Sequence, residues 1–184
     1  MAHALGSSLH GQVEHEVGRR PDGRRVLGRV DARLLRGGQP SADGFKALAA
    51  RGVTLIIDLR QGDERSEAER ELVTRLGMQY VAIPTSGWRT PRPQEVGRFL
   101  QLVRGAHDGT VFVHCRRGAE RTGVMVAAYR ISEQGWSPAE ARAEMDAYRF
   151  RAWLHPHLVR WVEEFAHGPA PTPTSTPALV PAHP

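Results

Sequence analysis

Short apolar runs that alternate with amphipathic segments constrain the fold of this chain more than any other feature. Residues 53–58 and 110–114 are apolar and β-branched, and residues 79–83 form a run of similar length, so we predict a strand at each place. Segments with helical periodicity separate them. Strands that alternate with helices form a mostly parallel sheet covered on both faces. We therefore predict an α/β fold with a central sheet of about four or five strands.

Helix-start and helix-stop signals predict helices between and after these strands. The helices are expected to begin near residues 41, 64, 93, 122, 137 and 156. Ser137 and Glu140 form a capping box, with proline at the first helical position. Gly52 and Gly77 are placed to end the two earliest helices. The helix over residues 122–134 is mostly apolar, so we expect it to be central and buried.

The chain has 184 residues, a length that fits one folded domain, which we place at residues 26–167. Residues 1–25 are rich in Gly, His and Arg and predict a flexible arm, whereas residues 168–184 are proline-rich and predict a disordered tail. The sequence shows neither an apolar run long enough to span a membrane nor a signal peptide. A cytoplasmic monomer is the default expectation.

The formal charge of +5 reflects an excess of arginine. Lysine and arginine together number 25, and Lys46 is the only lysine. The arginines are spread along the chain, and no nucleic-acid-binding motif occurs. We therefore expect a cationic surface that attracts anionic substrates rather than a nucleic-acid site.

Cys115 is the only cysteine, which excludes an internal disulfide and a multi-cysteine metal site. Such a cysteine is either an apolar filler or a nucleophile. Arg121 follows at a spacing that means little in an arginine-rich chain. The context is more specific, because a predicted strand leads into Cys115, Gly118 permits a tight turn, and a helix begins directly behind Arg121.

A strand–loop–helix turn of this kind can bind an oxyanion. Its backbone N–H groups can point inward, and the helix N-terminus adds donors and the positive end of a dipole. The same field favours the thiolate of Cys115 over the thiol. Arg121 can donate two parallel hydrogen bonds to phosphoryl oxygens, so we predict a cysteinyl-phosphate that is later hydrolysed. The phosphate-binding loop residues are expected to be Arg116, Arg117, Gly118, Ala119, Glu120 and Arg121.

Neighbours of this loop are candidates for supporting roles. His114 and Thr122 can hydrogen-bond around the thiolate, or can be a satisfied strand end and a helix cap. Asp58 ends a predicted strand at the same edge of the sheet, where a structural hydrogen bond is the simpler interpretation. Arg116 and Arg117 either grip a second phosphate or stay solvated.

Residues 114–123 read His-Cys-x5-Arg-Thr-Gly and resemble the signature loop of the protein tyrosine and dual-specificity phosphatase superfamily. Residues 35–41 and 53–60 are similar to the atypical dual-specificity phosphatases of the plant-and-fungal type and their bacterial relatives. The resemblance covers residues 26–165. It implies a cysteine-phosphatase fold for the predicted domain, no metal or other cofactor, and substrates that range from phosphotyrosine to phosphoinositides and inositol pyrophosphates.

One departure from the superfamily concerns the general acid. Its members commonly carry an aspartate on a mobile loop before the signature strand, whereas residues 84–95 contain a single carboxylate, Glu95, in the first turn of a predicted helix. Glu120 resembles an in-loop aspartate of myotubularin-like and some bacterial lipid phosphatases, so it is our candidate acid. The alternative is a solvated glutamate that balances a loop arginine. Asp58 and Asp63 are weaker candidates.

Three further side chains have more than one interpretation. Trp88 lies on the segment before the signature strand and can line the pocket or anchor the fold. His155 and His157 flank a helix start and suggest a metal site, but surface positions are the simpler expectation.

The leading function is a phosphatase for phosphotyrosine-type or polyanionic phosphomonoesters. A phosphate-binding pseudophosphatase or adaptor is the alternative that the missing loop aspartate favours. Rhodanese-like or arsenate chemistry is a third class, since those folds also use a loop cysteine. Thr122, Gly123 and the loop length favour phosphate.

Overall fold

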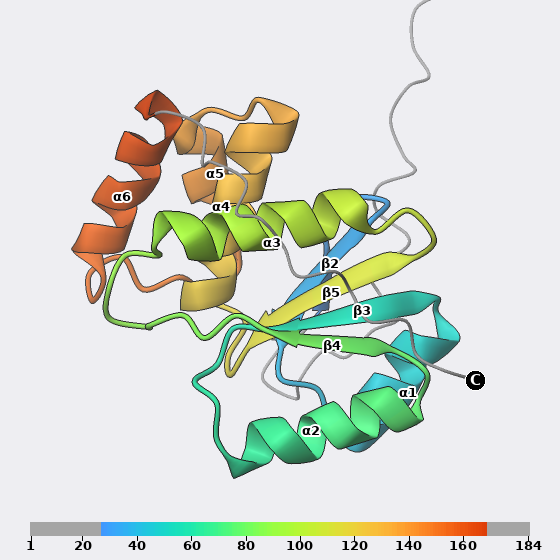
Figure 1. Cartoon of the computed structure of the whole chain (residues 1–184). Coiled ribbons are helices and arrows are strands. Elements are labelled where there is room, and N and C mark those ends of the chain that lie inside the picture. Colours follow the sequence, from blue (N-terminus) through green and yellow to red (C-terminus); the bar gives the residue numbers. More distant parts are fainter. Residues whose placement is uncertain (1–26, 169–184) are drawn as a thin grey trace, which may run out of the picture.

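The centre of the molecule is a five-stranded sheet in the order β1-β2-β5-β3-β4 (Figure 1). The structure, a computed structural model, describes residues 27–168. β1 pairs antiparallel with β2, and the other neighbours are parallel. The predicted α/β fold with a mostly parallel central sheet is therefore confirmed. The strands are β1 (Leu27–Arg29), β2 (Leu34–Gly38), β3 (Val53–Asp58), β4 (Gln79–Ala82) and β5 (Thr110–Cys115).

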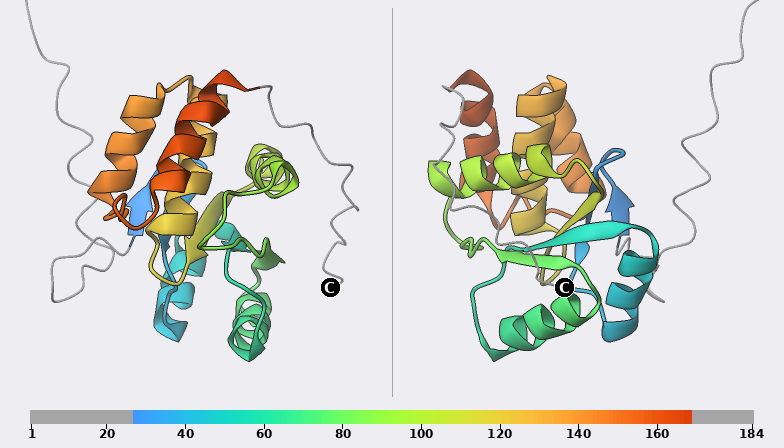
Figure 2. Two further views of the ribbon diagram at one scale, coloured as in Figure 1. Left: turned by 90° about the vertical axis from the view of Figure 1, so that its left-hand side faces the viewer. Right: turned by 45° about the vertical axis from the view of Figure 1, so that its right-hand side comes forward.

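Helices cover both faces of this sheet (Figures 1 and 2). One face carries two helices, and the other carries α3 and α4, with two more helices packed on α4. This is the layering that the alternating sequence predicts. The helices are α1 (Ala42–Ala50), α2 (Glu64–Arg75), α3 (Pro93–Gly105), α4 (Glu120–Gln134), α5 (Pro138–Ala147) and α6 (Pro156–His167).

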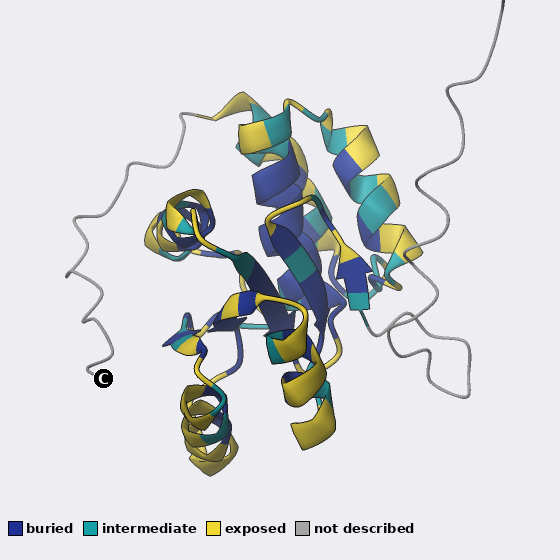
Figure 3. Cartoon of the chain, turned by 90° about the vertical axis from the view of Figure 1, so that its right-hand side faces the viewer, coloured by how far each residue is buried: buried dark blue, intermediate teal, exposed yellow. Residues whose placement is uncertain are grey.

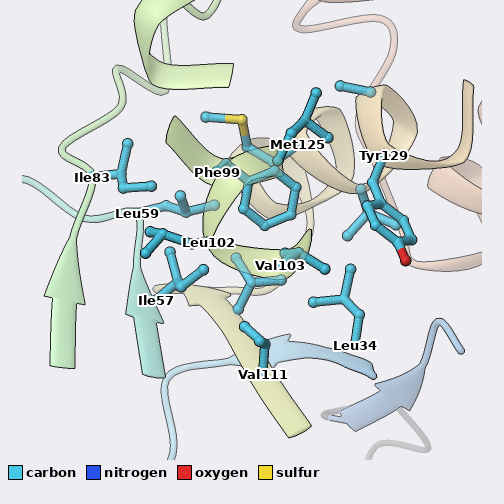
Figure 4. Packing of buried hydrophobic residues seen from close by; sticks show 14 of the residues in the cluster. Leu34, Ile57, Leu59, Ile83, Phe99, Leu102, Val103, Val111, Met125 and Tyr129 are labelled. Atoms are coloured by element: carbon cyan, nitrogen blue, oxygen red, sulfur yellow. The ribbon is translucent and has the colours of Figure 1, made fainter. Parts of the chain in front are cut away.

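Apolar side chains fill the space on both sides of the sheet. The cluster under α3 and α4 contains Ile57, Phe99 and Met125 (Figure 4). A second cluster, which contains Phe45 and Phe112, lies under α1 and α2. Figure 3 shows that α4 is buried along much of its length, as its apolar composition predicts.

Several helix ends lie where the sequence signals place them. Ser41 is the N-cap of α1, and its side chain accepts a backbone N–H of the first turn at 3.2 Å. The capping box of Ser137 and Glu140 is closed in both directions. Gly52 and Gly77 follow α1 and α2 with φ of 79° and 78°, a conformation that glycine adopts without strain.

The sequence pattern did not indicate β1 or β2. β1 has only 3 residues, and β2 reads Leu-Leu-Arg-Gly-Gly, in which glycine disfavours a strand. β2 forms because it lies between β1 and β5, where its backbone pairs on both sides. Arg36 of β2 is 0% exposed, an arrangement that no local preference predicts.

The carboxyl ends of three parallel strands meet at one edge of the sheet. The Cα register pairs Gly38 of β2 with Cys115 of β5, and Asp58 of β3 with His114. Ligands of open parallel sheets bind at this edge. The loop that begins at Cys115 therefore lies beside the segments that follow β2 and β3.

The predicted arm at residues 1–25 lies outside the described residues, and so does the predicted tail apart from its first residue. Within residues 27–168, no helix has the length and apolar composition needed to cross a membrane.

Replacing Phe99 by alanine is expected to lower the free energy of unfolding by about 3–5 kcal/mol, because its ring is fully buried between α3 and the sheet. Phe165 of α6 is only partly buried, so Phe165→Ala is the control with a smaller loss. Urea unfolding followed by circular dichroism measures both variants. Equal losses would contradict the central place of Phe99 in the core.

Candidate active site

Residues 115–121 (the signature loop) run from the last residue of β5 into the first turn of α4 and fold around the sulfur of Cys115. Gly118 donates its backbone N–H to Sγ at 3.2 Å. Cys115 is 2% exposed, so the sulfur lies at the base of the loop. A sulfur that accepts a loop amide has the surroundings of the predicted oxyanion nest.

The end of β2 lies directly beneath the signature loop. A Cβ atom on Gly118, whose φ is 73°, would lie 2.5 Å from the carbonyl carbon of Gly37 and from the nitrogen of Gly38. A Cβ atom on Gly38 would lie 3.3 Å from the loop backbone. The N–H of Gln39 donates to the carbonyl of Arg116 at 3.4 Å. Glycine at these positions therefore lets two backbone segments approach each other closely.

Arg121 lies in the first turn of α4 and reaches across to β3. Its Nη1 donates to the carbonyl oxygen of Leu59 at 3.2 Å. A Cβ atom on Gly87, in the segment before α3, would lie 3.9 Å from its Nε. The side chain is partly exposed. Since Leu59 engages one of the five N–H donors of a guanidinium, this anchor leaves Arg121 able to bind an anion.

Glu120, the candidate acid, is held by two cations. Its Oε1 accepts a hydrogen bond from Nη2 of Arg117 at 3.1 Å and from Nε of Arg151 at 2.8 Å, and the residue is 8% exposed. Hydrogen bonds between a guanidinium and a carboxylate are stronger than those between neutral groups. They favour an anchoring role for Glu120 over proton donation. Arg116 is exposed at the rim of the loop.

His114 is fully buried on the opposite side of the sheet from the sulfur. Successive strand residues point to opposite faces, and the imidazole of His114 stacks on Phe112 under α1 and α2. Its Nε2 lies 2.9 Å from Oε1 of Glu69 in α2. The carbonyl of His114 accepts the N–H of Leu59 at 2.9 Å. This placement favours support of the strand end over a hydrogen bond to the thiolate.

Asp58 is buried at the end of β3 with a complete set of donors. Arg60 donates to it through Nε at 2.9 Å and Nη2 at 2.7 Å, and the hydroxyl of Tyr80 donates at 2.6 Å. Burial alone would raise the pKa of Asp58, but hydrogen bonds from Arg60 and Tyr80 and the charge of His114 lower it to about 2. These contacts indicate that Asp58 has a structural role and that its carboxylate stays ionised.

The cluster of Asp58, Glu69 and His114 has the ligand types of a metal site, and its ligand atoms lie within 4.8 Å of one another. However, Nη2 of Arg60 donates to Asp58 at 2.7 Å and to Glu69 at 2.8 Å. The guanidinium thus supplies the positive charge that a cation would bring. The cluster fits an ion-pair network better than a metal centre.

Thr122 is fully buried in the first turn of α4. Ala119 is the N-cap of this helix, so the interpretation of Thr122 as a helix cap is wrong. Within residues 27–168, its Oγ1 has no hydrogen-bond partner. A buried hydroxyl without a partner is costly, which fits a role toward a ligand of the loop.

Trp88 and His155 lie against each other, with ring centroids 5.2 Å apart. Trp88 is 68% exposed, so it is not a buried anchor. His155 is 2% exposed, and the expectation of a surface position is wrong for it because Trp88 and Phe150 pack on its ring. Burial lowers the pKa of His155, although the charge of Glu120 opposes this shift.

The other carboxylate candidates serve helix ends. Oε2 of Glu95 accepts the N–H of Arg92 at 2.8 Å in the capping box of α3. Asp63 is the N-cap of α2, and its Oδ1 accepts the N–H of Ser66 at 3.0 Å. Neither carboxylate has the setting of a proton donor.

Several polar side chains near the site were not indicated by the sequence pattern. Arg36 is buried in β2, and its Nη2 donates to the carbonyl of Gly118 at 3.3 Å. Glu69 contacts His114, and Arg151 contacts Glu120, in each case from a distant part of the chain. Of these three residues only Arg36 had a signal in the sequence, because it is a charged residue that directly follows two leucines.

Comparison with known proteins places this loop in a family. The family model described as DSP-PTPase phosphatase fused to NAD+ kinase matches residues 16–155. The dual specificity protein phosphatase TpbA of Pseudomonas aeruginosa is 29% identical over 119 residues, which cover 65% of this chain and 52% of TpbA. The phosphatidylglycerophosphate phosphatase PTPMT2 of Arabidopsis thaliana is 28% identical over 150 residues, which cover 80% of this chain and 65% of that protein.

The solved structures agree with the fold. The crystal structure of P. aeruginosa TpbA superposes with a TM-score of 0.64 at 26% identity, over 77% of this chain and 88% of that chain. The cysteine-phosphatase fold is therefore confirmed. The chain spans about half the full length of TpbA.

Asp58 is expected to make the fold sensitive to acid. Its pKa of about 2 in the folded state lies below the ordinary value of 3.8. The ionised carboxylate therefore stabilises the fold above pH 4, and this stabilisation of about 2 kcal/mol is lost as the pH falls toward 2. Urea unfolding of wild type and Asp58→Asn over this range measures the effect.

Asp58→Asn is expected to have a lower free energy of unfolding than wild type at pH 7. The difference between the two free energies is expected to become smaller in acid. Asp43→Asn is the control, because Asp43 is exposed and meets only Lys46. A gap that stays constant from neutral to acid pH would show that Asp58 does not contribute through its charge.

Proposed function

The chain belongs to the family described as DSP-PTPase phosphatase fused to NAD+ kinase, and on this premise we propose that it is a cysteine-dependent phosphatase. The observation that carries the proposal is the hydrogen bond from the N–H of Gly118 to Sγ of Cys115 within one loop that ends at Arg121. Amide donors that can hold a sulfur anion can also hold phosphoryl oxygens. Cys115 and Arg121 are the proposed catalytic residues.

The proposed reaction has two displacement steps. The thiolate of Cys115 attacks phosphorus, so that a P–S bond forms and the P–O ester bond breaks. The leaving oxygen takes a proton. Water then attacks the phosphorus, the P–S bond breaks, and phosphate and the thiolate are released. Arg121 and the loop amides stabilise the negative charge on the equatorial oxygens in both steps.

The carboxylates near the loop limit which leaving groups the proposed enzyme can release. Glu120 is held by Arg117 and Arg151, and residues 84–94 contain no carboxylate. Without a proton donor the leaving oxygen must be a weak base, such as a phenol with a pKa near 10 or a phosphate. We therefore propose phosphotyrosine-type esters or phosphoanhydrides as the preferred substrates.

Positive charge around the edge of the sheet supports a polyanionic substrate. Arg116 and Arg117 are exposed on the signature loop. A separate cavity of about 460 Å³ at the end of β4, which no residue of the signature loop lines, has Arg89, Arg92 and Arg98 in its wall together with Glu95. The relatives TpbA and PTPMT2 carry the names of a protein phosphatase and a phospholipid phosphatase. These names cover both proposed substrate classes, a phosphorylated protein and a small polyanionic phosphate.

A phosphate-binding protein without turnover is the second candidate. The observation that favours it is the absence of a carboxylate from residues 84–94, where the superfamily commonly carries its acid. Phosphate release by the wild-type chain from an activated aryl phosphate separates the two functions, because such a substrate needs no acid.

Cys115→Ser is expected to abolish turnover, and Arg121→Lys is expected to lower kcat/KM about 100- to 1,000-fold, because lysine keeps the charge but not the paired donors. Release of phosphate from para-nitrophenyl phosphate measures both. Arg104→Lys is the matched control, since Arg104 pairs with Glu133 on the surface away from the loop. Residual turnover in Cys115→Ser would refute the covalent intermediate.

The wild-type chain is expected to turn over a phosphotyrosine peptide at least about 100-fold faster than the matching phosphoserine peptide. Glu120→Gln is expected to lower both rates by a similar factor, because an anchor for two arginines affects each substrate alike. A loss confined to the phosphoserine peptide would instead assign proton donation to Glu120. Equal wild-type rates on both peptides would defeat the proposed preference.

A further inference from the structure

Arg36 is a buried cation whose charge the fold compensates only in part. It lies in β2 opposite Val113 and is 0% exposed. Its guanidinium lies over the ring of Tyr148, 3.8 Å from the centroid. The carboxylate of Glu144 is 3.9 Å from Nη1, and it also pairs with Arg130 at 2.8 Å. Within residues 27–168, Nε and Nη1 have no hydrogen-bond partner. Such burial costs free energy that these contacts offset only in part.

The third nitrogen of this guanidinium fixes the direction of one loop peptide. Nη2 of Arg36 donates to the carbonyl oxygen of Gly118 at 3.3 Å. In a trans peptide the C=O and the following N–H point in opposite directions, and none of the described peptides is cis. Because the oxygen of Gly118 faces the guanidinium of Arg36, the N–H of Ala119 points away from that guanidinium.

A second loop peptide has the same arrangement. The backbone N–H of Gln39 donates to the carbonyl of Arg116 at 3.4 Å, so the N–H of Arg117 points away from Gln39. The contact of Gln39 comes from its backbone and survives a change of its side chain. The contact of Arg36 comes from its side chain, so substitution can test it.

We propose that Arg36 is a positioning residue that keeps the peptide between Gly118 and Ala119 with its N–H toward the bound phosphate, and that its charge stabilises both the thiolate of Cys115 and the phosphate. This inference rests on the proposed function, because it concerns the same loop. If the plane of that peptide flipped, the carbonyl oxygen of Gly118 would face the anion and repel it. Gly118, whose carbonyl oxygen accepts from Arg36, also donates its N–H to Sγ of Cys115 at 3.2 Å, so a single residue separates the guanidinium from the sulfur.

Alkylation of Cys115 tests this role without turnover, because the full chain has no other cysteine to react. The rate of reaction with iodoacetamide is measured against pH, and protection is measured with inorganic phosphate. In Arg36→Met the pH midpoint of alkylation is expected to rise by about one unit. The phosphate concentration that gives half protection is expected to rise about 10- to 100-fold. Arg36→Lys keeps the charge, so its midpoint is expected to stay near that of wild type while protection weakens about tenfold.

Arg130→Met is the matched control. Arg130 also pairs with Glu144 and also lies over an aromatic ring, that of Trp136, but its hydrogen bonds and ion pairs within residues 27–168 do not reach the loop. Arg130→Met is expected to lower the thermal unfolding temperature. Its pH midpoint of alkylation and its protection by phosphate are expected to stay at the wild-type values. Arg36→Met with the same pattern would overturn the inference and leave Arg36 a structural residue.

If Arg36→Met does not fold, Arg36→Lys decides, because wild-type phosphate protection in that variant would also overturn the inference. Failure of the proposed function has a different signature. A wild-type chain that releases no phosphate from para-nitrophenyl phosphate contradicts turnover, whereas the alkylation and protection results still decide the role of Arg36.

Discussion

The signature loop is proposed to bind an anion through its N–H groups, so its carbonyl oxygens must be directed elsewhere, and two of them are directed to β2 and the residue that follows it. The backbone of Gln39 and the side chain of Arg36 receive the oxygens of Arg116 and Gly118. This contact requires a close approach of the two segments, which a Cβ atom on Gly118 would prevent because it would lie 2.5 Å from the backbone of β2. In this arrangement the N–H of Gly118 reaches the sulfur of Cys115. The proposed binding of an anion by the loop thus depends on a strand that is distant from it in the sequence.

The ion network on the opposite face of the sheet supports the other side of the site. Arg60 joins Asp58 to Glu69, and Glu69 in turn lies beside His114. Burying these charges costs solvation energy that their mutual attraction repays only when the geometry is good. What the network fixes is the relative position of the ends of β3 and β5. Leu59 lies between them: its N–H donates to the carbonyl of His114, and its own carbonyl accepts from Arg121. Leu59, the anchor of Arg121, is therefore hydrogen-bonded to the strand ends that this network joins.

Much of this architecture could be predicted from the sequence, and the exceptions have a common physical cause. β3, β5 and the helices carry their own signals, because apolar periodicity and capping residues are local properties. β2 carries no such signal, since Leu-Leu-Arg-Gly-Gly becomes a strand only when its neighbours pair with it. The same holds for the site. The positions of Cys115 and Arg121 follow from one loop, whereas the contact of Arg151 with Glu120 joins residues 31 positions apart. The burial of His155 also depends on contacts with a distant segment, that of Trp88.

The carboxylates around the site explain why arginine dominates its chemistry. Asp58 and Glu69 are bound by Arg60, Glu120 is bound by Arg117 and Arg151, and Glu95 caps a helix. Each of these carboxylates therefore has an ion-pairing or capping role in the fold. The arginines also surround a loop whose own donors attract negative charge. An electrostatic arrangement of this kind lowers the energy of a phosphoryl group and of a departing anion together. It suits a reaction in which the leaving group departs with its charge and takes a proton from water afterwards.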